Sequence, residues 1–164
     1  LVTGVQTCAL PIFTHEFWTA GEFQADFTKD TTYDSSRNVL HCQVQTPSGI
    51  LHVLTTHGYH ISEHKRGDEH TLAACRQMAE YIDALDGPVV LTGDFNLVPD
   101  SESMRVFDAQ LKNLTRDYKL PTTRNHLTTK TEPCDYILLR DITEISFVAL
   151  DDIVSDHMAL MAEL

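Results

Sequence analysis

The residues best suited to chemistry in this sequence are Asp94 and Asn96, which follow the apolar run 88–91 (PVVL). The run is short, rich in β-branched residues and bounded by Gly87 and Gly93, a pattern that predicts a buried strand. Two positions apart on a strand, Asp94 and Asn96 would point the same way, where a carboxylate can bind a metal ion or water and an amide can hold an anionic oxygen. The alternative interpretation is a turn in which both side chains only satisfy backbone groups.

Three other places in the sequence carry groups suited to the same chemistry. Asp156 offers a hard oxygen ligand for Mg²⁺, and the adjacent His157 can donate to a phosphate or move a proton. His57 lies at the end of a predicted strand. Asp135 enters an apolar strand, where an unpaired acid is costly to bury, so we expect it to have a partner such as a histidine. Each of these residues, taken alone, also fits an ordinary turn or core role.

The elements that must position these residues alternate between strands and helices. We predict strands at 13–18, 38–45, 50–56, 88–91, 134–139, 145–150 and 158–164, a helix within 65–86, and a short helix within 99–109. The order strand, helix, strand across the centre of the chain predicts a layered α/β arrangement. The Thr-rich segment 111–130 is weakly patterned and is predicted to be a surface connection.

Composition limits the range of functions. The 164 residues suit one domain, and 24 acidic against 12 basic residues give a net charge of −12. Such a surface disfavours tight non-specific binding of nucleic acid, although a bound cation would still let a site accept phosphates. No apolar stretch reaches the length of a membrane span, so we expect no membrane partner. Four scattered cysteines predict a reducing, cytoplasmic location, and we expect a monomer.

Four short segments, taken together and in this order, resemble the endonuclease/exonuclease/phosphatase superfamily, which includes deoxyribonuclease I. They are 56–57 (TH), 93–96 (GDFN), 135–137 (DYI) and 155–157 (SDH). The resemblance implies a layered α/β sandwich of the deoxyribonuclease I-like type. It also implies a metal-dependent phosphoesterase or nuclease-like hydrolase, in which water attacks a phosphodiester or phosphomonoester.

The resemblance implies roles for four residues that act on the phosphate. His57 would donate a hydrogen bond to the scissile phosphate, and Asn96 would hold one of its oxygens. His157 would stabilise the transition state or transfer a proton. Asp135 would orient His157, which needs a partner to fix its tautomer.

The resemblance also implies a metal site. Asp156 and Asp94 would contribute ligands to Mg²⁺, for which Mn²⁺ is an alternative. Asp94 would in addition orient or deprotonate the attacking water. Asp94 and His157 both remain candidates for the general base. The substrate stays open between DNA, RNA, a lipid and a small phosphate ester.

Residues 1–12 fit none of this pattern. They lack the basic leader and long apolar core of a signal peptide and resemble a translated sequencing adapter, so we expect a non-native leader followed by the carboxyl-terminal part of one domain at 13–164. The glutamate that the family uses as a principal Mg²⁺ ligand has no match; Glu16 and Glu22 are candidates by residue type alone. We therefore expect a fold that is incomplete at the amino terminus and impaired catalysis. The alternative function is a catalytically inactive phosphate-binding or interaction domain of the same fold.

A second metal motif has to be weighed against this interpretation. Residues 60–64 (HISEH) match H-x-x-E-H, a pattern of zinc peptidases that requires a helix to place both histidines on one face. Gly58 and Gly67 flank the motif, which predicts a loop there. We therefore do not expect a zinc peptidase.

Overall fold

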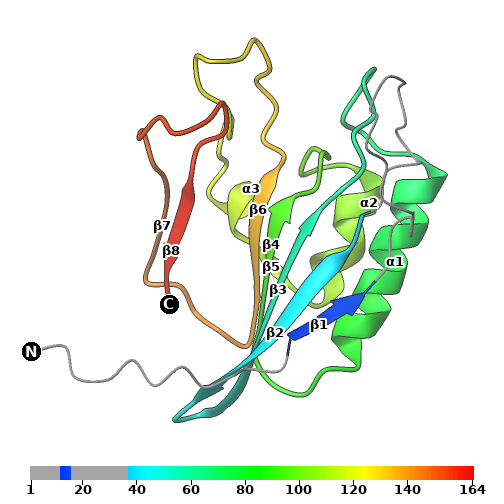
Figure 1. Cartoon of the computed structure of the whole chain (residues 1–164), viewed down its shortest axis with the longest axis vertical. Coiled ribbons are helices and arrows are strands. Elements are labelled where there is room, and N and C mark those ends of the chain that lie inside the picture. The colour runs from blue at the N-terminus through cyan, green and yellow to red at the C-terminus, as the bar shows by residue number, and fades with distance from the viewer. Residues whose placement is uncertain (1–11, 16–36) are drawn as a thin grey trace, which may run out of the picture.

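The computed structural model describes residues 12–15 and 37–164, which form three layers (Figure 1). A six-stranded sheet in the order β1-β2-β3-β4-β6-β5 lies between helices on one face and the two-stranded sheet β7-β8 on the other. The predicted layered α/β architecture is confirmed. No helix in the described part of the chain is long and apolar enough to cross a membrane.

The large sheet mixes parallel and antiparallel pairs. Its strands are β1 (Ile12–His15), β2 (Val39–Thr46), β3 (Gly49–His57), β4 (Val89–Asp94), β5 (Lys112–Asn113) and β6 (Asp135–Arg140). Only β3 and β4 run parallel, and the helix α1 makes the crossover between them. The predicted strands at 38–45, 50–56 and 134–139 are confirmed, whereas the predicted strand at 13–18 lies only partly within the described residues.

Helix α1 (Glu69–Asp83) covers one face of the large sheet, on the right in Figure 1. It begins at Asp68, whose carboxylate accepts a hydrogen bond from the backbone N–H of Thr71 while the Thr71 hydroxyl accepts one from Asp68, a reciprocal cap of the first turn. Its apolar side, which includes Met78, packs with Leu91 of β4 in the main core. The predicted helix is therefore present, although it is shorter than the range 65–86.

The segment after β4 holds more structure than its sequence indicates. It contains α2 (Glu102–Arg105), the 3-10 helix η1 (Val106–Ala109) and α3 (Leu114–Asp117). The prediction of a surface connection at 111–130 is wrong, because Thr123 and Arg124 are both buried.

The opposite face of the large sheet is covered by the hairpin of β7 (Ser146–Ala149) and β8 (Leu160–Glu163). Because side chains alternate along a strand, Val90 of β4 points toward this hairpin while its neighbours point toward α1. Val90 belongs to a second, smaller group of buried residues with Leu114, Leu139 and Phe147. The two faces of the sheet therefore carry separate cores of unequal size.

Candidate active site

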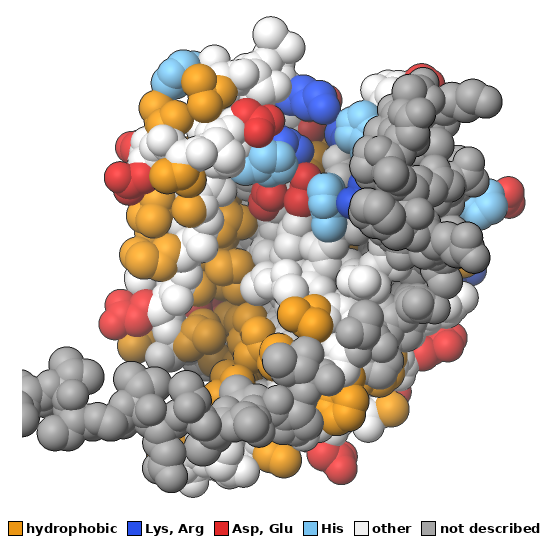
Figure 2. Space-filling model, in the orientation of Figure 1, with side chains coloured by type: hydrophobic (Ala, Val, Ile, Leu, Met, Phe, Trp, Pro, Cys, Tyr) orange, Lys and Arg blue, Asp and Glu red, His pale blue; other side chains and the backbone are white. Residues whose placement is uncertain are grey.

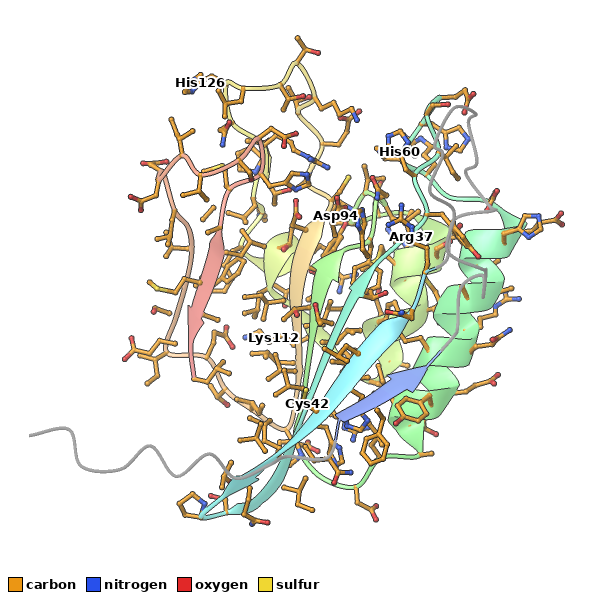
Figure 3. All side chains as sticks on the ribbon, in the orientation of Figure 1. Arg37, Cys42, His60, Asp94, Lys112 and His126 are labelled. Carbon is orange, nitrogen blue, oxygen red and sulfur yellow. The ribbon has the colours of Figure 1, made fainter. Side chains whose placement is uncertain are left out.

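Three of the predicted site residues occupy one row of the large sheet. His57 of β3 lies opposite Asp94 of β4, and Asp94 lies opposite Asp135 of β6. Asp94 has the same parity as Val90, so the row faces away from α1 and toward the side of the small sheet. Figure 3 shows Asp94 near the upper end of the sheet, where β3 and β4 end and β6 begins.

The close approach of β3 and β4 at this row requires Gly93. A Cβ atom on Gly93 would lie 1.9 Å from the carbonyl oxygen of Thr56, and the residue has a φ of +140°. Only glycine fits this combination of space and conformation. Strand β4 therefore continues through Gly93 to Asp94, beyond the predicted run 88–91.

The chain turns sharply after Asp94. Asn96 has a φ of +55°, so the expectation that it shares strand parity with Asp94 is wrong. Its backbone N–H donates to Asp94 Oδ1 over 2.7 Å, which is the turn interaction named as the alternative above. The Asn96 side chain is only 3% exposed, and its oxygen accepts a 2.7 Å hydrogen bond from Lys65 Nζ. Burial lowers the pKa of Lys65.

Asp135 and His157 form the expected pair. His157 Nδ1 lies 2.9 Å from Asp135 Oδ1, and the Thr123 hydroxyl donates to Asp135 Oδ2 over 2.5 Å. Burial raises the pKa of Asp135, and the bond from Thr123 opposes that shift. Because the carboxylate accepts from Nδ1, His157 presents Nε2 to the site, 3.8 Å from Asp94 Oδ2.

Arg124 is a site residue that the sequence did not reveal. Its guanidinium contacts His157 Nε2 and lies 3.4 Å from Asp94 Oδ2 and 3.5 Å from Asp156 Oδ2. The side chain is 5% exposed, so its charge is compensated inside the protein by these carboxylates. Asp156 itself is 46% exposed and joins the group through Arg124.

A short antiparallel contact between two loops holds Arg124 in place. Arg124 forms an isolated bridge with His157, and the backbone N–H of Met158 donates to the carbonyl of Thr123 over 2.9 Å. The backbone N–H of Asn125 donates to the carbonyl of Asp156 over 3.1 Å. No local sequence pattern predicts this pairing, because Arg124 and His157 lie 33 residues apart in the sequence.

His57 lies on β3, on the side of Asp94 opposite to Asp135. Its Nε2 lies 3.9 Å from Asp94 Oδ2, and Arg37 Nη1 lies 3.1 Å from its Nδ1. Burial lowers the pKa of His57, Arg37 lowers it further, and Asp94 acts in the opposite direction. The space-filling view shows the histidines and acidic side chains of this region gathered in a hollow above the sheet (Figure 2).

Asp94, Asp135 and His157 form a group that can hold a metal ion. One ligand atom from each lies within 4.8 Å of the others. Both oxygens of Asp135 already accept hydrogen bonds from Thr123 or His157. Asp94 Oδ2 and the Asp156 carboxylate instead face a guanidinium, so they are the oxygens already arranged around a positive charge.

The zinc-peptidase motif lies in the loop between β3 and α1. Without a helix, His60 and His64 do not share the face that the motif needs. The metal-compatible group found among residues 12–15 and 37–164 does not include them. The expectation of a loop at the motif is confirmed.

The described residues form a layered α/β fold with acids and histidines at one end of its central strands. Residues 25–157 match the family model described as Endonuclease/Exonuclease/phosphatase family. The chain therefore belongs to this family. No match was found among curated proteins.

Solved structures share this fold at low sequence identity. A functionally unknown conserved protein from Enterococcus faecalis is 21% identical with a TM-score of 0.70, and the match covers 93% of this chain and 64% of that one. A mannosyl-6-phosphatase from Bacteroides thetaiotaomicron is 20% identical, with a TM-score of 0.61 and coverage of 77% and 56%. D. rerio TDP2, complexed with single strand DNA product, is 18% identical, with a TM-score of 0.65 and coverage of 93% and 66%. The chain thus spans about 64% of the length of the first of these proteins.

Proposed function

We propose that the protein is a metal-dependent phosphoesterase that hydrolyses a phosphodiester or phosphomonoester by attack of water. The observation that carries this proposal is the row of His57, Asp94 and Asp135 with His157 hydrogen-bonded to Asp135. Acids and imidazoles at this spacing can bind a phosphate, move a proton and hold a cation together.

Each side chain has a task that its contacts support. His57 donates to a phosphate oxygen. Lys65 occupies the amide oxygen of Asn96 and one amide proton goes to the carbonyl oxygen of Gly58 over 3.4 Å, so Asn96 offers its second amide proton. Asp135 is a positioning residue, since it acts by holding His157 through Nδ1. Asp94 and His157 are the two candidates to accept the proton of the attacking water. Asp94 Oδ2 and His157 Nε2 lie 3.8 Å apart, and both face the guanidinium of Arg124, which has to leave the atom that acts as the base.

The fold family implies a divalent cation, and the residues present fit one. Asp94 and Asp156 would hold Mg²⁺ or Mn²⁺, because oxygen ligands suit these ions. Asp94 belongs to the group that can hold an ion, whereas Asp156 joins it through Arg124, whose guanidinium the ion would displace. The cation would supply stabilisation of the charge that builds on the phosphate oxygens.

Hydrolysis of bis(p-nitrophenyl) phosphate and p-nitrophenyl phosphate, each with Mg²⁺, Mn²⁺ or EDTA, tests the proposal. Asp94→Asn and His157→Ala should each lower the rate on the order of a thousandfold, equivalent to about 4 kcal/mol of transition-state stabilisation. Arg66→Ala, which removes an exposed charge away from the row, is the matched control. Turnover that survives both site variants would contradict the proposal, and the pH–rate profiles of the two variants distinguish the candidate bases.

A further inference from the structure

A buried lysine lies beside Asn96. Lys65 is 8% exposed, and its Nζ donates to Asn96 Oδ1 over 2.7 Å. No acidic residue in the described part of the chain forms an ion pair with it. We propose that Lys65 is a positioning residue, whose ammonium fixes the Asn96 amide and strengthens the hydrogen bond that this amide donates to a phosphate oxygen. The inference rests on the proposed function, because it assigns a further residue to the same site.

The burial of this charge is costly to the fold, because an ammonium group loses its water and gains no carboxylate in return. Burial lowers the pKa of Lys65, and the nearby Lys130 lowers it further, while Cys134 acts in the opposite direction. The interaction that offsets the cost is the hydrogen bond to Asn96, whose amide oxygen is the negative end of a dipole. The charge of Lys65 is therefore directed at one neighbour, and that neighbour belongs to the site.

The ammonium determines which way the Asn96 amide faces. An ammonium group only donates hydrogen bonds, so it must face the amide oxygen, and a rotated amide would place N–H groups against N–H groups. Nδ2 is thereby directed to the carbonyl oxygen of Gly58, 3.4 Å away, and its second proton is left for a ligand. A positive charge at the amide oxygen also polarises the amide, which makes Nδ2 a stronger donor.

The loop that carries Lys65 is tied to the turn that carries Asn96. The backbone N–H of Val98 donates to the carbonyl oxygen of Lys65 over 2.8 Å. A Cβ atom on Gly58 would lie 2.4 Å from the carbonyl oxygen of Phe95, so the loop and the turn are in direct contact. The amide donor is therefore held in place before a phosphate arrives and does not have to reorient as charge builds on its oxygens.

A double-mutant cycle on orthovanadate binding tests the coupling between the two residues. Orthovanadate is a phosphate analogue that can adopt the five-coordinate geometry of the transition state, and isothermal titration with Mg²⁺ present measures its affinity. Lys65→Met and Asn96→Ala should each weaken binding about tenfold, and the double variant should bind no more weakly than either single variant. Lys65→Arg keeps a charged donor and should bind between Lys65→Met and the unmodified chain. Arg66→Ala removes the neighbouring exposed charge and should leave the affinity unchanged.

Nuclear magnetic resonance follows the Asn96 amide directly. Its side-chain N–H signals are assigned by their loss in Asn96→Asp, and in the unmodified chain they should shift when orthovanadate is added. In Lys65→Met the shift should be smaller, because the amide is no longer held and polarised at its oxygen. Far-UV circular dichroism verifies that each variant is folded.

The outcomes separate the role of Lys65 from the proposed function. Losses that add in the double variant, or Asn96 signals that do not respond to orthovanadate in the unmodified chain, overturn the proposal. Phosphodiester turnover with additive losses supports hydrolysis and rejects the role of Lys65. Coupled losses without any turnover keep Lys65 as the residue that positions Asn96 on a bound phosphate and reject hydrolysis.

Discussion

The two sides of Asp94 differ in how their positive charges are compensated. On one side, Arg124 is buried and faces the carboxylates of Asp94 and Asp156. On the other side, Arg37 contacts His57 alone among residues 12–15 and 37–164, and it lines an open cavity. The guanidinium of Arg124 forms part of the protein's own network, whereas Arg37 has no carboxylate partner in the part of the chain that the structure describes. The comparison therefore separates an arginine that holds the site together from one whose described contact is a single histidine.

Replacement of Arg124 should have the largest effect on stability. Arg124→Met leaves Asp94 and Asp156 without their cation, and we expect a loss of about 3 kcal/mol in the free energy of unfolding, because breaking a buried ion pair from one side is costly. Urea unfolding followed by circular dichroism measures the change, with Arg124→Lys as the control that keeps the charge. Wild-type stability in Arg124→Met would remove the distinction between the two arginines.

Phe147→Ala tests how far the stability of the region around Arg124 depends on the small sheet β7-β8. Phe147 is 8% exposed, packs in the smaller core and makes an edge-on contact with Tyr118 at 5.2 Å between ring centres. We expect a loss of about 2 kcal/mol, below the usual range for a fully enclosed phenylalanine, because this thin layer can collapse around the gap. Hydrogen exchange should show β7 and β8 losing protection before β3 and β4. Simultaneous loss in all four strands would show that the two faces unfold as one unit.

Thr123→Val tests the hydrogen bonds beneath Asp135. The change removes the hydroxyl that donates to Asp135 Oδ2 and accepts from the backbone N–H of Cys134. Since valine has nearly the same shape, the expected loss of about 1 kcal/mol reports on hydrogen bonding rather than packing. Differential scanning calorimetry measures it, and Thr122→Val nearby, at a half-buried position, is the matched control. Equal effects of the two changes would mean that the bonds to Asp135 carry no special weight.

Arg37→Ala should have the smallest effect on stability. In the described part of the chain its guanidinium contacts His57 alone, so we expect a change within about 0.5 kcal/mol. Chemical denaturation of this variant beside Arg124→Met gives the comparison in one experiment. A loss as large as that of Arg124→Met would place Arg37 in the structural network.

Local patterns in the sequence predicted much of the fold. Alternation along 38–45 and the β-branched run before Asp94 gave strands that the structure contains. The pattern of 65–86 gave the helix before β4. These signals work because each records which side of one element is buried, and that information lies within a few neighbouring residues.

Features that depend on distant contacts were not predictable. Arg124 lies in a Thr-rich segment, and its burial results from pairing with the loop at 156–158. Lys65 is buried because its loop packs on the turn after β4, where Lys65 meets Asn96. The strand parity expected for Asn96 failed because the chain adopts a left-handed conformation there. In each case the neighbour that decides the outcome is far away in the sequence.

The row formed by His57, Asp94 and Asp135 has a consequence for which parts of the chain can change length. Side chains alternate between faces, so one inserted or deleted residue in β3, β4 or β6 would turn a member of the row toward α1. The loops between these strands carry no such constraint, since added residues there leave the register intact. Length variation among relatives should therefore concentrate at exposed stretches such as 62–64 and 126–132, while the three strands keep their spacing. The number of residues between the site residues can vary among relatives, whereas the position of each site residue on its strand cannot.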